Sequence, residues 1–466
     1  MYDTLIIGSG LSSIFFLEGY KNKNKNKNEK MAVISYEASS EQNQEKTDVS
    51  LKNKIKDNLP PRFKADNIGS ISDFFIKNKT TPSDNLSIFG LLQDGGVSNY
   101  WGMSCDFPKI NKLDFLNKKN RDALINSFNY IYNKFNFEGV VSNENVTANN
   151  EKKIENYFSK VLECKNDNIN FYKNCSAIDG VKYLIPSTIN TDYSNIDKLN
   201  YFVNTIVKEG NIYRIHCTNS LNEKRSFVTK KLILACGTIG TTRLLLGMLN
   251  YEKPVKVFHN PMLFACILSN QKVQKDFKHW MSQIASDSFD SKTNSYAACN
   301  FRSTNEYIKR KIFKDYWFMK NFFSKYVYNF LAERMVFVNL YIEAKYSNLI
   351  IQKEDDNYKI FSSNENMKLT KKILHNHLTK NTETLLKNNL ITQFMYSTIP
   401  KSGHDNHYTG TIKINKDDTP LSVDEMCELK NFDNLYIVDG SVIPGDISFF
   451  PTGIIIANAY RVGSTI

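Results

Sequence analysis

Short apolar runs that end at glycine or at polar loops recur along this chain, and they predict strands alternating with helices. Residues 5–7 form the first apolar run, and Gly-Ser-Gly follows it directly. A run of this length is typical of a buried parallel strand, and residues 11–19 behind it have the composition of a helix. A second apolar run at residues 31–36 predicts the next strand. This order of strand, turn, helix and strand is typical of an α/β domain.

The turn at residues 8–13 carries the first candidate binding site. Gly8 can adopt a tight turn and Gly10 lets the backbone approach a pyrophosphate, while the helix that begins here offers free N–H groups and the positive end of its dipole. Ser13 stands where a third glycine is usual and is small enough for close packing. Glu37 closes the second strand, where a carboxylate can accept hydrogen bonds from a ribose. We predict a dinucleotide site; the alternative is a glycine-rich turn in an ordinary α/β domain.

The same patterns divide the rest of the chain. Polar residues 38–85 predict a long excursion with little regular structure, and order is expected to return at residues 86–92. Helical spacing of apolar residues predicts two helices within residues 111–165. Further strands are expected at residues 199–207, 212–217, 231–237 and 435–438, and further helices at residues 238–249 and from Pro451 onward. The first two of these strands form a hairpin around residues 208–211.

Residues 251–400 have a different character. Their longer apolar runs are consistent with strands of one antiparallel sheet, at residues 255–258, 262–268, 296–302 and 335–344. Between the last two runs, residues 311–330 combine aromatic side chains at helical spacing with several lysines. Most such stripes face a core. The alternative is peripheral contact with a partner or a membrane surface, because the lysines flank the apolar face.

Composition narrows the class of protein. A chain of 466 residues exceeds one comfortable core, so we expect two domains. The sequence contains no run of eighteen uncharged apolar residues, and the predicted strand at its start leaves no room for a signal peptide, so we expect a cytoplasmic protein. The eight cysteines lack CxxC or metal-ligand spacing and are expected to be reduced thiols without a metal. The net charge of +12 is diluted among solvated Lys/Asn-rich segments such as residues 21–28, which argues against a nucleic-acid partner.

Two further clusters carry candidate chemistry. In residues 93–102, two glycines precede Ser98, Asn99 and Trp101, so this loop can approach a flat ring closely; a structural turn capped by a packed tryptophan is the alternative. In the C-terminal segment, His404 and His407 precede the strand at residues 435–438, which ends at Asp439-Gly440. The helix that Pro451 opens presents unpaired N–H groups at its start.

Taken in order, five segments resemble the glucose-methanol-choline (GMC) family of flavin oxidoreductases. They are residues 6–10 with Glu37, 95–102, 233–245, 407–411, and 435–444 with the helix that follows. The middle of the chain is similar only in layout. The short Gly-Gly-x-Ser-Asn-x-Trp-Gly form resembles members associated with bacterial surface-polysaccharide gene sets.

The resemblance implies an α/β fold in which a discontinuous Rossmann-like FAD-binding domain accompanies a substrate domain built on an antiparallel sheet with helices. The FAD-binding domain would comprise residues 1–110, 191–250 and 401–466, the last carrying the catalytic histidine loop. Residues 251–400 would form the substrate-binding domain, with residues 111–190 as its helical insert.

The resemblance also assigns site residues. It implies non-covalent FAD, because loop 95–105 lacks the histidine to which some members attach the flavin. The implied cofactor contacts are Gly8, Gly10, Ser13, Glu37, Gly96, Ser98, Asn99, Val203, Cys236, Gly237, Asp439, Gly440 and Thr452. Trp101, His404 and Phe450 are the candidate substrate contacts.

Within this resemblance His407 is the candidate base, because an imidazole can accept a hydroxyl proton near neutral pH. Phe450 is a departure, since it stands where the family usually has His or Asn. Three interpretations follow: His407 works alone, another residue substitutes, or the protein does not oxidise alcohols. We expect oxidation of a hydroxyl on a carbohydrate-like or other polar alcohol, with an unidentified electron acceptor. A non-redox flavoprotein and a non-catalytic protein with this fold are the rival hypotheses.

Overall fold

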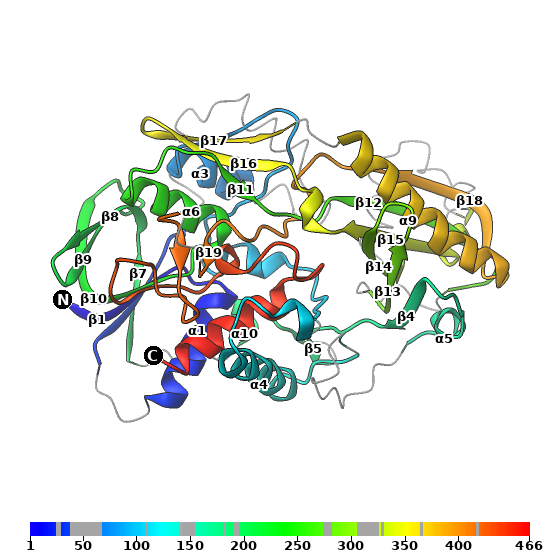
Figure 1. The fold of residues 1–466 in the computed structure, drawn as a ribbon, viewed down its shortest axis with the longest axis horizontal. Helices are drawn as coiled ribbons and strands as arrows, with labels where there is room; N and C mark the ends of the chain where they lie inside the picture. The colour runs from blue at the N-terminus through cyan, green and yellow to red at the C-terminus, as the bar shows by residue number, and fades with distance from the viewer. Residues whose placement is uncertain are drawn as a thin grey trace.

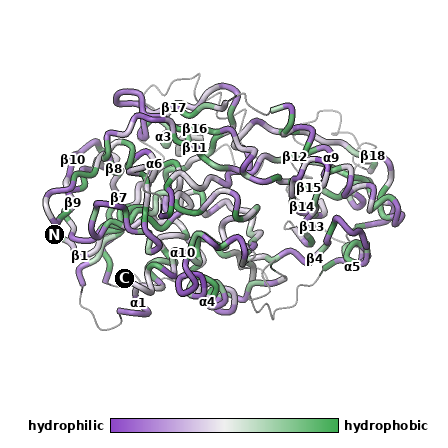
Figure 2. Tube along the Cα trace, in the orientation of Figure 1, coloured by the Kyte–Doolittle hydropathy of each residue, from purple (hydrophilic) through white to green (hydrophobic). Residues whose placement is uncertain are grey.

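The fold comes from a computed structural model, which describes residues 1–24, 29–37, 68–108, 110–139, 141, 154–179, 182–189, 195–273, 282–304, 326–327, 330–363, 367–415 and 419–466. A seven-stranded sheet lies at one end of the elongated molecule and a six-stranded sheet at the other, as Figure 1 shows. A four-stranded sheet runs along one side between them. Figure 2 shows hydrophobic stretches along the strands and hydrophilic ones at the outer turns.

The seven-stranded sheet combines a parallel part with an antiparallel hairpin. Its order is β7 (Ile196–Asn200), β2 (Met31–Ser35), β1 (Tyr2–Ile7), β10 (Lys224–Leu234), β9 (Ile212–Thr218) and β8 (Phe202–Glu209), and β21 (Leu435–Ile437) also pairs with β10. The first half of β10 pairs antiparallel with β9, and its second half pairs parallel with β1 and β21. The chain therefore brings strands from its beginning, middle and end to one sheet.

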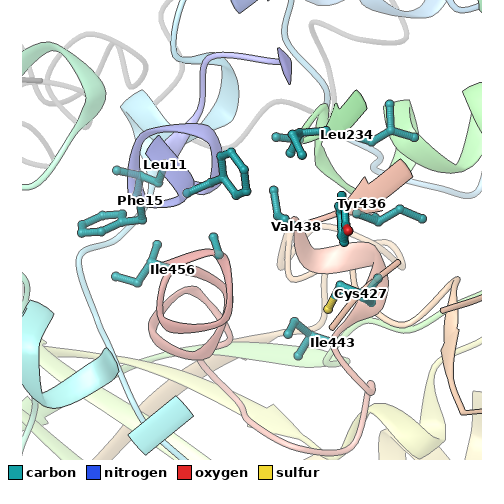
Figure 3. Packing of buried hydrophobic residues seen from close by; sticks show 14 of the residues in the cluster. Leu11, Phe15, Leu234, Cys427, Tyr436, Val438, Ile443 and Ile456 are labelled. Atoms are coloured by element: carbon teal, nitrogen blue, oxygen red, sulfur yellow. The ribbon is translucent and has the colours of Figure 1, made fainter. Parts of the chain in front are cut away.

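Helices α1 (Leu11–Lys23) and α10 (Thr452–Gly463) cross at short distance beside this sheet. A Cβ atom on Gly19 would lie 2.3 Å from the Tyr460 carbonyl oxygen, and one on Gly463 would lie 2.1 Å from that of Phe16. Figure 3 shows Leu11 and Phe15 of α1 next to Ile456 of α10. This contact fixes the start of α10 relative to the β1–α1 turn. Helices α6 (Gly237–Met248) and α4 (Lys118–Lys134) complete this part of the fold.

Neighbouring strands of the six-stranded sheet are all antiparallel. Its order is β18 (Ile391–Thr398), β12 (Met262–Ser269), β15 (Met335–Ile342), β14 (Ser295–Ser303), β13 (Ile284–Asp290) and β4 (Ile169–Lys173). Helix α9 (Met367–Lys387) packs on one face and buries Ile373, Leu374 and Leu378 in a second core. Side chains alternate along β14, so its odd-numbered residues face this core and its even-numbered residues face the other side of the sheet.

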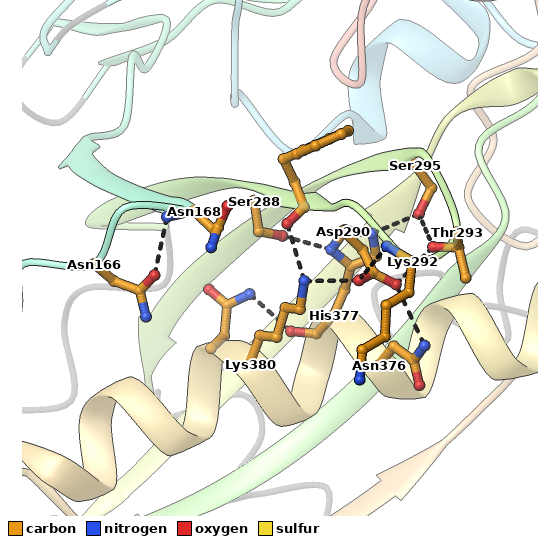
Figure 4. A network of polar contacts seen from close by, with 12 residues as sticks. Asn166, Asn168, Ser288, Asp290, Lys292, Thr293, Ser295, Asn376, His377 and Lys380 are labelled. Atoms are coloured by element: carbon orange, nitrogen blue, oxygen red, sulfur yellow. Dashed lines mark hydrogen bonds and ion pairs between the residues drawn. The ribbon is translucent and has the colours of Figure 1, made fainter.

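Polar contacts also hold α9 to its face of the sheet, as Figure 4 shows. The His377 ring nitrogens lie 2.8 Å from the Ser288 hydroxyl and 2.9 Å from the Ser295 hydroxyl. Lys380 Nζ donates to Asp290 Oδ1 over 2.7 Å. Burial lowers the pKa of His377 to about 4. Burial opposes ionisation of Asp290, but the hydrogen bonds from Lys380, Thr293 and Asn376, together with the charge of Lys380, outweigh it and hold the pKa of that carboxyl well below its usual range.

Part of the expected layout is corrected. Residues 251–400 do not form a single sheet, because β11 (Val255–Val257), β16 (Leu349–Glu354) and β17 (Asn357–Ser362) pair with β3 (Thr80–Pro82) in the four-stranded sheet. The partner strand β3 comes from a distant segment that no local pattern indicates. For the same reason the six-stranded sheet gains β4 from the region expected to be helical.

The expectations for residues 68–92 and 111–165 can also be compared with the structure. Helices α4 and α5 (Asn156–Leu162) confirm the two helices expected within residues 111–165. Helix α3 (Ile68–Lys77) lies in a stretch expected to lack regular structure. Within residues 86–92, where order was expected to return, Leu86 forms a parallel bridge with Ser402. Two small pairs, β5 (Ile178–Asp179) with β6 (Lys182–Tyr183) and β19 (Lys413–Ile414) with β20 (Ser422–Val423), complete the strands.

Some of the sequence-based expectations concern residues that the structure does not describe. Most of residues 311–330 and residues 38–67 lie outside the described residues. Among the residues that are described, no helix has the length and apolar character needed to cross a membrane. Within that same part of the chain, no cluster of His, Cys, Asp and Glu could hold a metal ion.

Candidate active site

A cavity of about 720 Å³ lies between the carboxyl ends of the parallel strands and one face of the six-stranded sheet. On one side it is lined by the residues that follow β1, β2 and β10. On the other side it is lined by residues of β12, β14 and β15. The carboxyl ends of parallel strands are the usual place for a nucleotide ligand in α/β folds.

Most residues predicted as cofactor contacts line this cavity. They are Gly8, Gly10, Gly96, Ser98, Val203, Cys236, Gly237, Asp439, Gly440 and Thr452. Three others do not. Ser13 is fully buried, Glu37 is exposed with its backbone N–H bonded to Asn200 Oδ1, and Asn99 donates to the Asp94 carbonyl oxygen.

Glycines make a close-fitting cradle at the strand ends. Gly8 has a φ of 109°, and a Cβ atom there would lie 2.1 Å from the Ala235 carbonyl oxygen. A Cβ atom on Gly440 would lie 2.9 Å from Thr238 Oγ1. The loop with the paired glycines is bonded onto this turn, since Leu11 N donates to Ser98 Oγ over 3.2 Å. The cradle places backbone, rather than side chains, against whatever fills this end of the cavity, as a pyrophosphate requires.

Asp439 and Arg243 hold together the segments that surround the cradle. Thr241 Oγ1 donates to Asp439 Oδ2 over 2.5 Å, and burial raises the pKa of Asp439. The Arg243 guanidinium donates to the carbonyl oxygens of Val203 and Asn204 and to Asn78 Oδ1. Arg243 therefore links the beginning of β8 to α6. The sequence pattern did not single out Arg243, which lies on an otherwise apolar helix.

His407 lines the same cavity, at the end facing the six-stranded sheet. Its ring stacks on Tyr341 with centroids 5.1 Å apart, and Phe450 lies edge-on at 6.2 Å. The Phe450 and Tyr341 rings are 5.5 Å apart in an edge arrangement. Phe450 therefore supplies an aromatic wall beside His407. The other candidate substrate contacts, Trp101 and His404, also line the cavity.

A buried carboxylate organises the loop that carries His407. Asp405 Oδ1 lies 2.8 Å from His259 Nδ1, and Asp405 Oδ2 accepts from the backbone N–H of Asn260 and of His407. Burial opposes ionisation of Asp405, but the neighbouring His259 and His407 outweigh it and lower the pKa of that carboxyl. Asp405 and His259 were not predicted. The position of Asp405 between two histidines was the available signal.

The sheet side of the cavity contains residues that the sequence pattern did not single out. Asn300 and Arg302 come from β14, and Asn339 and Tyr341 come from β15. Asn300 pairs directly with Asn339 across the two strands. Their alternate spacing along each strand was the available signal, because alternate residues of a strand share a face.

Together, the two large sheets and the cavity between them define the mixed α/β fold expected from the sequence. The comparisons with known proteins agree with it. The GMC oxidoreductase family model matches residues 355–459. The chain is similar to the crystal structure of pyridoxine 4-oxidase from Mesorbium loti, with a TM-score of 0.62 and 12% sequence identity over 99% of this chain and 98% of that chain. No curated protein matches the chain in sequence. At this identity the likeness to the solved structure concerns the fold.

Proposed function

We propose that the protein is an FAD-dependent oxidoreductase that oxidises a hydroxyl group, with His407 as the base that accepts the hydroxyl proton. One observation carries this proposal: His407 lines the same cavity as Gly8 of the glycine cradle, although these two residues lie about four hundred positions apart in the sequence. The match of the GMC oxidoreductase model to residues 355–459 supports it, since that range includes His407.

The glycine positions of the cavity support binding of a dinucleotide, which we propose is held without a covalent bond. The Gly8 and Gly440 positions leave no room for a side chain, and the start of α1 supplies N–H groups beside them. Thr452, at the start of α10, brings the positive end of that helix to the cavity, which favours a negative charge there. FAD would supply a hydride acceptor. The residues that would hold it are those of the cradle, the loop at Gly96 and Ser98, and the start of α10.

The side chains near His407 would prepare the proton transfer. Asp405 anchors the backbone N–H of His407 and so fixes the loop. Tyr341 and Phe450 enclose the imidazole between aromatic rings, which excludes water from two sides. Since Phe450 cannot hydrogen-bond a substrate hydroxyl, His407 acts without the usual second polar residue.

We further propose a carbohydrate-like or other polar alcohol as substrate. Trp101 has its ring fixed by a hydrogen bond from Nε1 to the Leu184 carbonyl oxygen, so it presents a rigid flat surface for a sugar face. We also propose that the protein is cytoplasmic, acts in polysaccharide biosynthesis and has no nucleic-acid partner. An unidentified acceptor would take the electrons from the reduced cofactor. Peripheral membrane contact through residues 311–330 also stays a proposal.

An absorption spectrum of the purified protein tests the cofactor and the reaction together. The proposal predicts the bands of oxidised flavin, and their lasting loss when a panel of sugars and other polar alcohols is added without oxygen. His407→Ala should retain the flavin bands and lose the bleaching. Bleaching at the wild-type rate in His407→Ala would remove this residue from the mechanism.

Phe450 favours a second candidate, a flavoprotein that performs a non-redox reaction such as isomerisation. In that case product would form while the flavin bands persist. A colourless protein that takes up no FAD would instead support a non-catalytic binding role for the fold.

A further inference from the structure

Three buried or partly buried arginines differ in how their charge is satisfied. Arg243 donates to two carbonyl oxygens and to Asn78. Arg461 donates to the Glu425 carbonyl oxygen and to Asn458 Oδ1. Arg302 on β14 has no hydrogen bond and no ion pair with any residue that the structure describes, and its Nε atom is buried.

Arg302 lines the cavity on the sheet side. Asn300, two positions earlier on the same face, is buried, and its Oδ1 atom has no hydrogen-bond partner among the described residues. The Asn300 amide group donates to Ser104 Oγ over 3.1 Å, which fixes its orientation. A cation and an amide oxygen, neither hydrogen-bonded to a described residue, therefore lie close together on one wall of the cavity.

Leaving such groups unpaired in a protein interior is unfavourable, because burial removes their contacts with water. Burial lowers the pKa of Arg302, which is the direction expected for a cation without a counter-ion. A bound anion would restore the missing contacts, since a guanidinium group matches a carboxylate or phosphate with paired hydrogen bonds.

We propose that the substrate is an alcohol that also carries a carboxylate or phosphate group, and that Arg302 binds this anionic group. The inference rests on the proposed oxidation of a hydroxyl group at His407, and it names the substrate class. Arg302 here determines specificity, while His407 performs the chemistry.

The register of the sheet gives the scale of this substrate. Tyr341, which stacks on His407, lies directly across from Ala298 on β14. Arg302 follows Ala298 by four positions, which corresponds to about 13 Å along a strand. The Arg302 side chain spans part of that distance. The anionic group should therefore be separated from the reacting hydroxyl by several bonds, rather than be its direct neighbour.

Binding calorimetry on the FAD-loaded protein tests the proposal without depending on turnover. The probes are inorganic phosphate, 4-hydroxybutyrate and 1,4-butanediol, the last two having equal chain length and differing in the carboxylate. We expect at least one of the two anions to bind about tenfold or more tightly than the diol, as charged hydrogen bonds allow. The phosphate and carboxylate probes separate the two possible anionic groups.

Arg302→Gln should remove this preference, and Arg302→Lys should retain part of it, because lysine keeps the charge without the paired geometry. Arg214→Gln is the matched control: it makes the same change of charge on β9, outside the cavity, and should keep the wild-type preference. Arg302→Met, an apolar residue of similar length, replaces Arg302→Gln should the latter fail to fold.

Two results would overturn the proposal: a wild-type protein that binds anions no better than the diol, or a preference that survives in Arg302→Gln. If the protein takes up no FAD, the proposed oxidation fails on its own. The same titration of the purified protein then still shows whether Arg302 recognises an anion.

Discussion

The two faces of the six-stranded sheet both bury polar side chains, but they satisfy them differently. On the face covered by α9, the ring nitrogens of His377 meet Ser288 and Ser295, and Asp290 meets Lys380. On the cavity face, Arg302 and Asn300 Oδ1 lack partners among the described residues. The polar groups around His377 and Asp290 are satisfied by the protein itself, whereas we propose that a ligand satisfies Arg302 and Asn300 Oδ1.

The contrast separates stability from function within a single sheet. Hydrogen-bonded polar groups under α9 should contribute to folding, and their loss should leave chemistry in the cavity intact. Polar groups on the cavity wall should contribute to binding and catalysis, and their loss should barely affect folding. Substitutions on either face test this distinction.

The largest effect is expected at His407. His407→Gln should slow substrate-driven flavin reduction by about 10²–10⁴-fold, the usual contribution of a positioned base, with no change in the unfolding midpoint. Anaerobic stopped-flow absorbance measures the rate, once an oxidised alcohol has been identified. His404→Gln is the control, because His404 lines the same cavity but is held by the Ser87 hydroxyl. An equal loss of rate in both variants would contradict a distinct role for His407 as the base.

The next effect concerns the dependence of stability on pH. Because the pKa of His377 is about 4 in the folded protein and 6.5 ordinarily, the unfolded chain binds a proton first as the pH falls. Its contribution is therefore fully present above pH 6.5 and decreases between pH 6.5 and pH 4, by up to about 3 kcal/mol. Urea unfolding across this range should show a shallower decrease in His377→Gln than in the wild type. His375→Gln, at an exposed site on the same helix, should follow the wild type.

Asp290→Asn should destabilise the protein by about 2 kcal/mol, because it leaves the Lys380 ammonium group without its carboxylate. Flavin content and reaction rate per folded molecule should stay unchanged, since Asp290 faces α9. Urea unfolding together with flavin absorbance measures both quantities. Glu209→Gln removes the exposed partner of Arg214 and should leave the unfolding midpoint where it is. Loss of activity in folded Asp290→Asn would contradict the separation of the two faces.

The smallest effect is expected at Phe450. Phe450→Leu removes the edge-on contacts with Tyr341 and His407 but keeps an apolar side chain, and should cost about 0.5–1.5 kcal/mol of stability. The rate should change by less than tenfold, because no proton-transferring group is lost. Thermal unfolding and single-turnover flavin reduction measure the two values. A much larger loss of rate would assign the ring a direct part in binding the alcohol.

Much of the parallel sheet could be predicted, because its strands are short apolar runs that end at glycine. Gly8, Gly10 and the Asp439-Gly440 pair could be found in this way, and all four line the cavity. The division of residues 251–400 between two sheets could not be predicted, since the choice between β3 and β12 as a partner depends on tertiary packing rather than local sequence.

The site was less predictable than the cradle. His407 stood out only through a resemblance to other proteins, and Arg302 resembled any polar residue on a half-buried strand. The proposed role of Arg302 could not be predicted, because it depends on the finding that no described residue forms a hydrogen bond with this side chain. Glu37 stands at a strand end as the pattern requires but is not among the residues that line the cavity, so its contact with a ribose stays a prediction.

The proposed function depends on one cavity that holds the cofactor at the cradle and the reacting alcohol beside His407. A crystal structure of the FAD-loaded protein measures this directly. We expect the adenosine half of FAD to lie along the Gly8 turn. The flavin ring should lie next to the loop at Gly96, with the His407 side chain facing its edge. Density for FAD outside this cavity, or a ring separated from His407 by protein, would contradict it.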